Sequence, residues 1–76
     1  MPRITEMWAY VIEDSGPEDE GVAAARVGGE WMPLVGADRA RAESMRPFAV
    51  EIGRRLGKPI RLVRFTDREG VEVLVP

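Results

Sequence analysis

The strand-forming segments of this chain are apolar on both faces, whereas a single segment has the spacing of an amphipathic helix. We expect the strand at 4–12 to carry two apolar faces, with Ile4, Trp8, Tyr10 and Ile12 on one and Met7, Ala9 and Val11 on the other. An antiparallel sheet with one solvated face should instead alternate apolar and polar residues. A helix of about 20 residues covers roughly two or three strands, on one face only. The sequence therefore predicts more apolar sheet surface than its helix can cover.

Turn signals divide the first half of the chain into short strands. The acidic segment 13–21 breaks the apolar pattern and contains a Gly-Pro pair, so we expect an exposed, mobile loop there. The segments 22–27 and 30–35 predict a hairpin. Between them stand Gly28 and Gly29, which suit the positive φ angles of a two-residue turn.

The segment 38–57 predicts the helix. Its apolar residues recur at spacings of three and four, which is typical of one buried stripe: Met45, Phe48, Ala49, Ile52 and Leu56. Asp38 suits the N-cap and Gly57 suits the C-terminal end. Pro47 would lie inside this helix, so we expect either a kink there or two shorter helices that break between 44 and 46. Because the apolar stripe keeps its phase, we favour one helix kinked at Pro47.

The segments 60–66 and 71–75 predict a final hairpin. With a three-residue loop at 68–70, Phe65 lies opposite Val73. We assign five of its side chains to the helix side: Val63, Phe65, Val71, Val73 and Val75. The other side would then carry Ile60, Leu62 and Leu74.

These elements give the order β-β-β-α-β-β, an α+β two-layer sandwich with a mostly antiparallel sheet and one helix on one face. We expect residues 1–76 to form a single small domain. Either the Trp8 set or the Met7 set of the first strand must lie away from the helix. We predict an exposed contact surface there, formed by Trp8, Tyr10, Ile12, Leu62 and Leu74. A curled sheet or the 13–21 loop folded over that face is the alternative.

The side-chain inventory excludes most catalytic chemistry. The chain has no Cys and no His, which removes thiolate nucleophiles, the usual general base near neutral pH and the commonest zinc ligands. The acidic segment 13–21 lacks the regular ligand spacing of a calcium-binding loop. We therefore expect a protein that is not an enzyme, with no cofactor and no metal site.

Charge is separated along the chain. Residues 1–30 carry two Arg and seven acidic residues, whereas residues 38–58 carry six basic and three acidic residues. Four basic residues of the predicted helix and its end are candidate contacts for an anion or a nucleic acid: Arg39, Arg46, Arg54 and Lys58. Glutamates three and four positions away predict internal ion pairs instead. The overall net charge of −2 also disfavours a nucleic-acid partner.

Together these patterns favour a small protein-interaction module that self-associates, as a homodimer, through an apolar sheet face or edge. The alternative is a nucleic-acid-binding accessory protein that uses the Arg-rich helix 38–57. The sequence has no apolar run of the ~18 residues that a membrane span needs and no leader pattern, so we expect a cytoplasmic protein without a membrane partner. Ten Arg against one Lys, without Asn or Gln, fits either a heat-adapted source or a codon bias.

Overall fold

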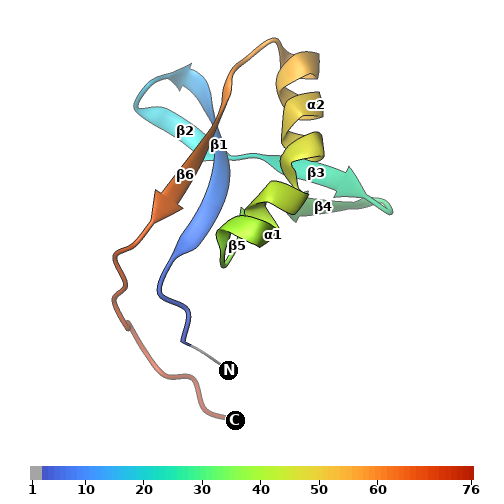
Figure 1. Ribbon diagram of the computed structural model, residues 1–76. Helices are drawn as coiled ribbons and strands as arrows, with labels where there is room; N and C mark the ends of the chain where they lie inside the picture. The colour runs from blue at the N-terminus through green and yellow to red at the C-terminus, as the bar shows by residue number, and fades with distance from the viewer. Residues whose placement is uncertain (1–2) are drawn as a thin grey trace.

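The structure is a computed structural model that describes residues 3–76, and it has the predicted α+β fold. Its elements are, in chain order, β1 (Met7–Gly16), β2 (Asp19–Val22), β3 (Ala24–Val27), β4 (Glu30–Pro33), β5 (Val35–Gly36), α1 (Arg39–Ser44), α2 (Arg46–Leu56) and β6 (Ile60–Phe65). The strand pairs in the described part of the chain are antiparallel. Both helices and the β3–β4 hairpin lie on the same side of β1 and β6 (Figure 1).

β1 is the central strand, and two different strands share one of its edges. β6 pairs with one edge of β1, from Met7 to Ile12. Along the opposite edge, β5 pairs with the first half of β1 and β2 pairs with its second half. At the division, the Tyr10 N–H donates to the Leu34 carbonyl (3.1 Å) and the Tyr10 carbonyl accepts from the Ala23 N–H (2.8 Å). The chain leaves the main sheet at this junction and forms the separate β3–β4 hairpin.

The acidic segment 13–21, predicted to be a mobile loop, is the tip of the β1–β2 hairpin. β1 continues to Gly16 and β2 begins at Asp19, with an irregular register between Glu13 and Gly16. The prediction was wrong because a hairpin tip can be solvated on both faces while its backbone ladder continues. The turn at Gly28 and Gly29 is confirmed, since both residues have positive φ angles, of 58° and 86°.

The helical segment is two helices that meet at Met45, so the prediction of one kinked helix was wrong. Pro47 lies in the first turn of α2, where its missing N–H interrupts no helical hydrogen bond. The alternative that we weighed, a break between 44 and 46, is the one observed. The cap predictions are confirmed: the Asp38 carboxylate accepts from the Arg41 N–H at 2.8 Å, and α2 ends at Gly57 with φ 65°.

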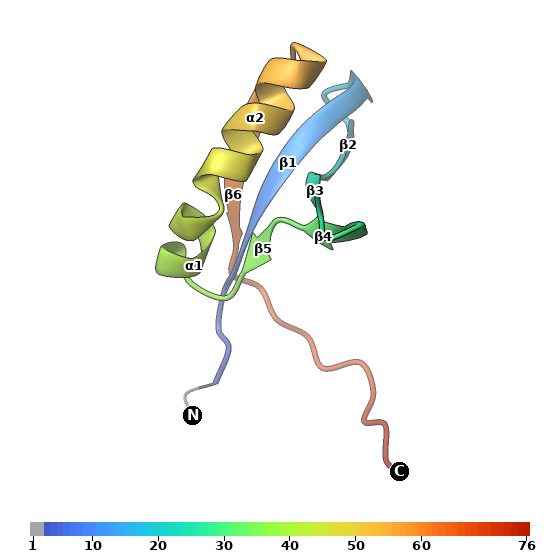
Figure 2. The same ribbon diagram turned by 90° about the vertical axis from the view of Figure 1, so that its right-hand side faces the viewer.

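The predicted final hairpin is absent. β6 ends at Phe65, and residues 66–76 contain no strand. Gly70 does not have the positive φ that the predicted bulge would need. Instead, the Arg68 guanidinium donates to the carbonyl oxygen of Ile4 at 3.1 Å, which directs the chain past the N-terminal segment. The last residues run away from the sheet and the helices (Figure 2).

The core lies between the helices and the face of β1 that carries Tyr10. Its buried cluster consists of Tyr10, Ala23, Ala25, Leu34, Ala42 and Ala49. Ile60 and Leu62 pack against this cluster and pair with Ile12 and Tyr10, so they face the helices. The faces of β6 were therefore assigned the wrong way round. Both faces of this strand are apolar, so its alternation could not distinguish them.

Candidate interaction surface

The five residues predicted to form a contact surface do not lie together on an open face. Tyr10 is 4% exposed, and Trp8 and Leu62 pack against the same core on the helix side. The half-buried Ile12 lies on this side too, opposite Ile60. Leu74 is 83% exposed but belongs to the segment after β6. The structure thus separates Leu74 from the other four and places those four on the covered side of the sheet.

The opposite face of the sheet, which we call the outer face, carries the other apolar set. The register places seven apolar side chains on it: Met7, Ala9, Val11, Val22, Val35, Val63 and Phe65. Met7, Val22 and Phe65 are 38%, 50% and 49% exposed, whereas Ala9 and Val11 are each 4% exposed. Both helices lie on the other side of the sheet (Figure 2). The outer face is therefore the apolar sheet surface that the helices leave open.

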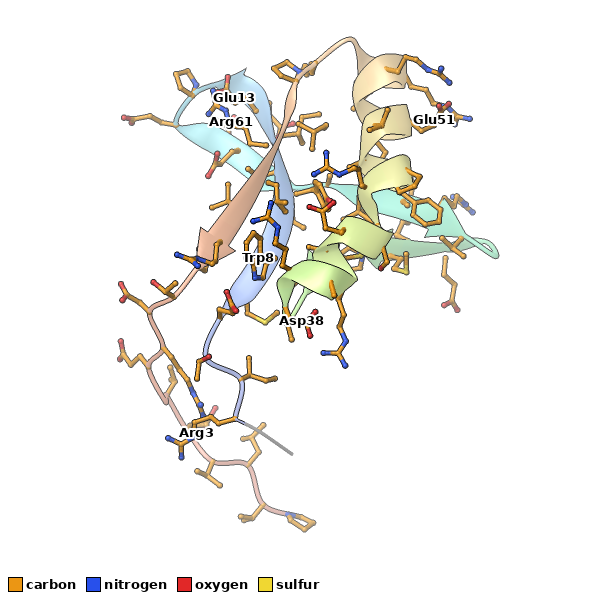
Figure 3. The ribbon with its side chains drawn as sticks, viewed as in Figure 1. Arg3, Trp8, Glu13, Asp38, Glu51 and Arg61 are labelled. Atoms are coloured by element: carbon orange, nitrogen blue, oxygen red, sulfur yellow. The ribbon has the colours of Figure 1, made fainter. Side chains whose placement is uncertain are left out.

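An ion pair borders the outer face at one end. Arg61, which lies opposite Val11, contacts the Glu13 carboxylate at 3.0 Å. The two side chains lie together beside the upper part of β1 (Figure 3). The rim is thus polar at this end only, where it borders the apolar middle of the face at Ala9 and Val63; Met7 and Phe65 form the opposite end. An apolar centre with a polar rim is the usual composition of a protein contact surface.

Two hollows lie on the helix side of the sheet. One, of about 440 Å³, lies between α2 and β6 above Tyr10 and has Arg46 and Lys58 in its wall. The other, of about 310 Å³, lies between α2 and the β3–β4 hairpin and includes the exposed side chains of Trp31 and Phe48. Sequence reasoning missed the second hollow, because the pattern does not show that the hairpin leaves the main sheet.

The first two candidate anion contacts, Arg39 and Arg46, are engaged within the molecule. Arg46 makes two hydrogen bonds to the Glu43 carboxylate, at 2.8 and 3.1 Å. Arg39 lies 3.7 Å from the same carboxylate and stacks over the Trp8 ring at 5.5 Å. The hydrogen bond from Arg46 lowers the pKa of Glu43 below its ordinary value. These contacts are the internal ion pairs that the spacing of the charges predicts.

The other two candidates are engaged as well. Arg54 pairs with Glu51, which also accepts a hydrogen bond from Arg55 at 2.9 Å. Arg55 is the main cause of the lowered pKa of Glu51. The Lys58 ammonium donates to the carbonyl oxygens of Glu13 and Asp14, at 3.2 and 3.1 Å. The structure therefore does not gather the four predicted residues into one unpaired basic patch.

Comparison of the chain with known protein families, with curated proteins and with solved structures finds no match. Among residues 3–76, no helix is long and apolar enough to cross a membrane. The longer helix, α2, has eleven residues, whereas a span needs about 20. A functional conclusion must therefore come from the surfaces described above.

Proposed function

We propose that this protein is a non-enzymatic interaction module that forms a homodimer through the outer face of its sheet. The observation that carries this proposal is a row of apolar residues, from Met7 and Phe65 to Val11 and Val22, on a sheet face that the helices leave open. A solvated face should carry polar residues at these positions. Two copies related by a two-fold axis would remove both faces from water with a single type of contact.

Coverage by the chain itself has less support. The acidic segment 13–21 pairs within the plane of the sheet instead of folding over it. The residues after Phe65 run away from the sheet (Figure 1). Met7, Val22 and Phe65 remain exposed at the borders of the outer face, whereas Ala9 and Val11 in its middle are 4% exposed. A second copy is therefore the better candidate to cover it.

The nucleic-acid alternative also has less support. A phosphate-binding surface needs basic side chains that are free to meet the backbone of the nucleic acid. Arg46 and Arg54 are held by Glu43 and Glu51, and these carboxylates would lie in the same surface. Lys58 is held by two backbone carbonyls. The charges on the helices are thus paired within the fold, which supports the outer face over the helices as the proposed contact surface.

The two phenylalanines provide a matched test. Phe65 lies on the outer face and Phe48 lies on α2, with exposed fractions of 49% and 43%. Phe65→Glu places a charge in the proposed contact, so we expect it to yield a chain of 8.5 kDa by light scattering. Phe48→Glu should keep the dimer mass of the unaltered chain. Circular dichroism would verify that both variants fold. A Phe65→Glu variant that keeps the dimer mass contradicts the proposal.

A further inference from the structure

The segment 71–75 has the composition of a strand but has no strand partner within the described residues. It consists of three valines, Leu74 and one charged residue, Glu72, a composition that favours extended structure. The four apolar side chains, Val71, Val73, Leu74 and Val75, are 80 to 86% exposed. So much exposed apolar surface in one short segment marks a site of contact.

The strand β6 presents a free edge. It pairs with β1 along one side, and no strand among residues 3–76 pairs with its other side. β6 is six residues long, contains no proline and has a regular register with β1. Such an edge accepts a further strand readily, and natural proteins usually protect it. The other strands with an open edge in the described residues are shorter than β6: β2, β3 and β4 have four residues each, and β5 has two. β2 also carries two acidic residues next to an irregular register.

We propose that the segment 71–75 of one copy adds as an antiparallel strand to the free edge of β6 in a second copy, and that the second copy returns the same contact. This proposal rests on the proposed self-association and identifies the segment and the strand edge that produce it. Within the described residues each chain carries an apolar segment without a strand partner and, at β6, its longest strand with an open edge, so a two-fold pair satisfies both. Within one chain the segment runs away from β6 (Figure 2), and Arg68 just before it donates to the Ile4 carbonyl.

The side chains of the exchanged strand complement those of β6. With Phe65 opposite Val73, the three valines of the segment extend the outer face by one strand. Leu74 then lies opposite Arg64 on the helix side, and Glu72 is the diagonal neighbour of Arg64. Within the described residues Arg64 stacks over the Trp8 ring but makes no ion pair. The Glu72 carboxylate of the second copy supplies the missing partner.

Disulfide trapping tests the exchange directly, because the chain contains no Cys. The paired Cα atoms of antiparallel strands lie about 4.5 to 5.5 Å apart, which is within the range of a disulfide. The double variant Arg64→Cys, Leu74→Cys should therefore oxidise to a covalent dimer on a non-reducing gel. In the control variant Arg64→Cys, Val71→Cys, the two positions are displaced along the strands by about 10 Å. This control should remain a single chain after the same treatment.

Two gel outcomes overturn the exchange. An internal disulfide, which leaves the mass of a single chain, means that the segment closes the hairpin on its own β6. The absence of any disulfide in the Arg64, Leu74 variant means that the segment does not reach this edge in either chain. In both cases the effect of Phe65→Glu on mass still tests the proposed function separately.

Removal of residues 71–76 gives a second measurement. We expect a chain that ends at Gly70 to fold, because the removed side chains are exposed, and to self-associate more than about tenfold more weakly. A truncated chain with unchanged self-association overturns the exchange. If that dimer is still broken by Phe65→Glu, the proposed function stands on the outer face alone.

Discussion

Tyr10 joins the middle of β1 to α1 through one buried hydrogen bond. Its hydroxyl donates to the carbonyl oxygen of Ala42 at 2.8 Å, and the two residues are 4% and 0% exposed. Buried tyrosines usually satisfy their hydroxyl in this way while the ring fills the core. The strand pattern predicted that Tyr10 belongs to a contact surface, whereas the structure shows a core residue whose hydroxyl has one polar partner.

Tyr10→Phe should lower the free energy of unfolding by about 0.5 to 1.5 kcal/mol, because it removes this hydrogen bond and keeps the ring. Ser44→Ala is the matched control. It removes a hydroxyl that donates to the Arg41 carbonyl at 2.6 Å on the exposed side of the same helix, and it should change stability by less than about 0.5 kcal/mol. Urea unfolding measures both. Equal losses in the two variants would show that the Tyr10 bond has no special weight.

The helices α1 and α2 each carry one glutamate that serves two arginines. Glu43 lies between Arg39 and Arg46, and Glu51 has the same role for Arg54 and Arg55. The hydrogen bonds lower the pKa of both carboxyl groups below their ordinary value of 4.5. A group with a lowered pKa in the folded state stabilises the fold above its unfolded pKa.

The contribution of Glu43 and Glu51 should therefore be fully present above about pH 5 and should disappear as the pH falls through their lowered pKa values. We expect the variant Glu43→Gln, Glu51→Gln to unfold at lower urea than the unaltered chain at pH 7. The two urea midpoints should converge once the pH falls below the lowered pKa values, because both carboxyl groups are then neutral. Because both carboxylates are exposed, the difference is small and should shrink in high salt. A difference that is independent of pH contradicts this account.

The sequence was sufficient to predict the elements whose signals are local. The N-cap at Asp38, the turn at Gly28 and the end of α2 at Gly57 depend on a few neighbouring residues, and all three are confirmed. Pro47 was misassigned because a stripe of apolar residues can continue in phase across two helices. The first turn of a new helix accommodates proline without strain.

The sides of the sheet could not be predicted, because both faces of β1 and β6 are apolar. The apolar sheet surface that the helices do not cover is the outer face. Its residues, however, are Met7 and Phe65 with their neighbours instead of Trp8 and Tyr10. Whether the segment 71–75 has a partner is also not a local property. A strand pattern indicates extended structure but does not identify the edge that pairs with it.

The molecule is one-sided. Both helices and the β3–β4 hairpin gather on one side of the central strand β1, as Figure 1 shows. The consequence is an apolar outer face, a free edge at β6 and an apolar segment beyond it, all in the same chain. A two-fold pair of chains would cover the face and fill the edge together, because the exchanged strand extends the face that the dimer buries.

Sedimentation equilibrium of the unaltered chain over a dilution series measures the self-association directly. If the outer face binds a second copy, the mass is twice 8.5 kDa at high concentration and falls toward 8.5 kDa on dilution. A mass of 8.5 kDa at every concentration up to about 1 mM would mean that any affinity between copies is too weak to cover the outer face. That result would contradict the proposal that this face binds a second copy.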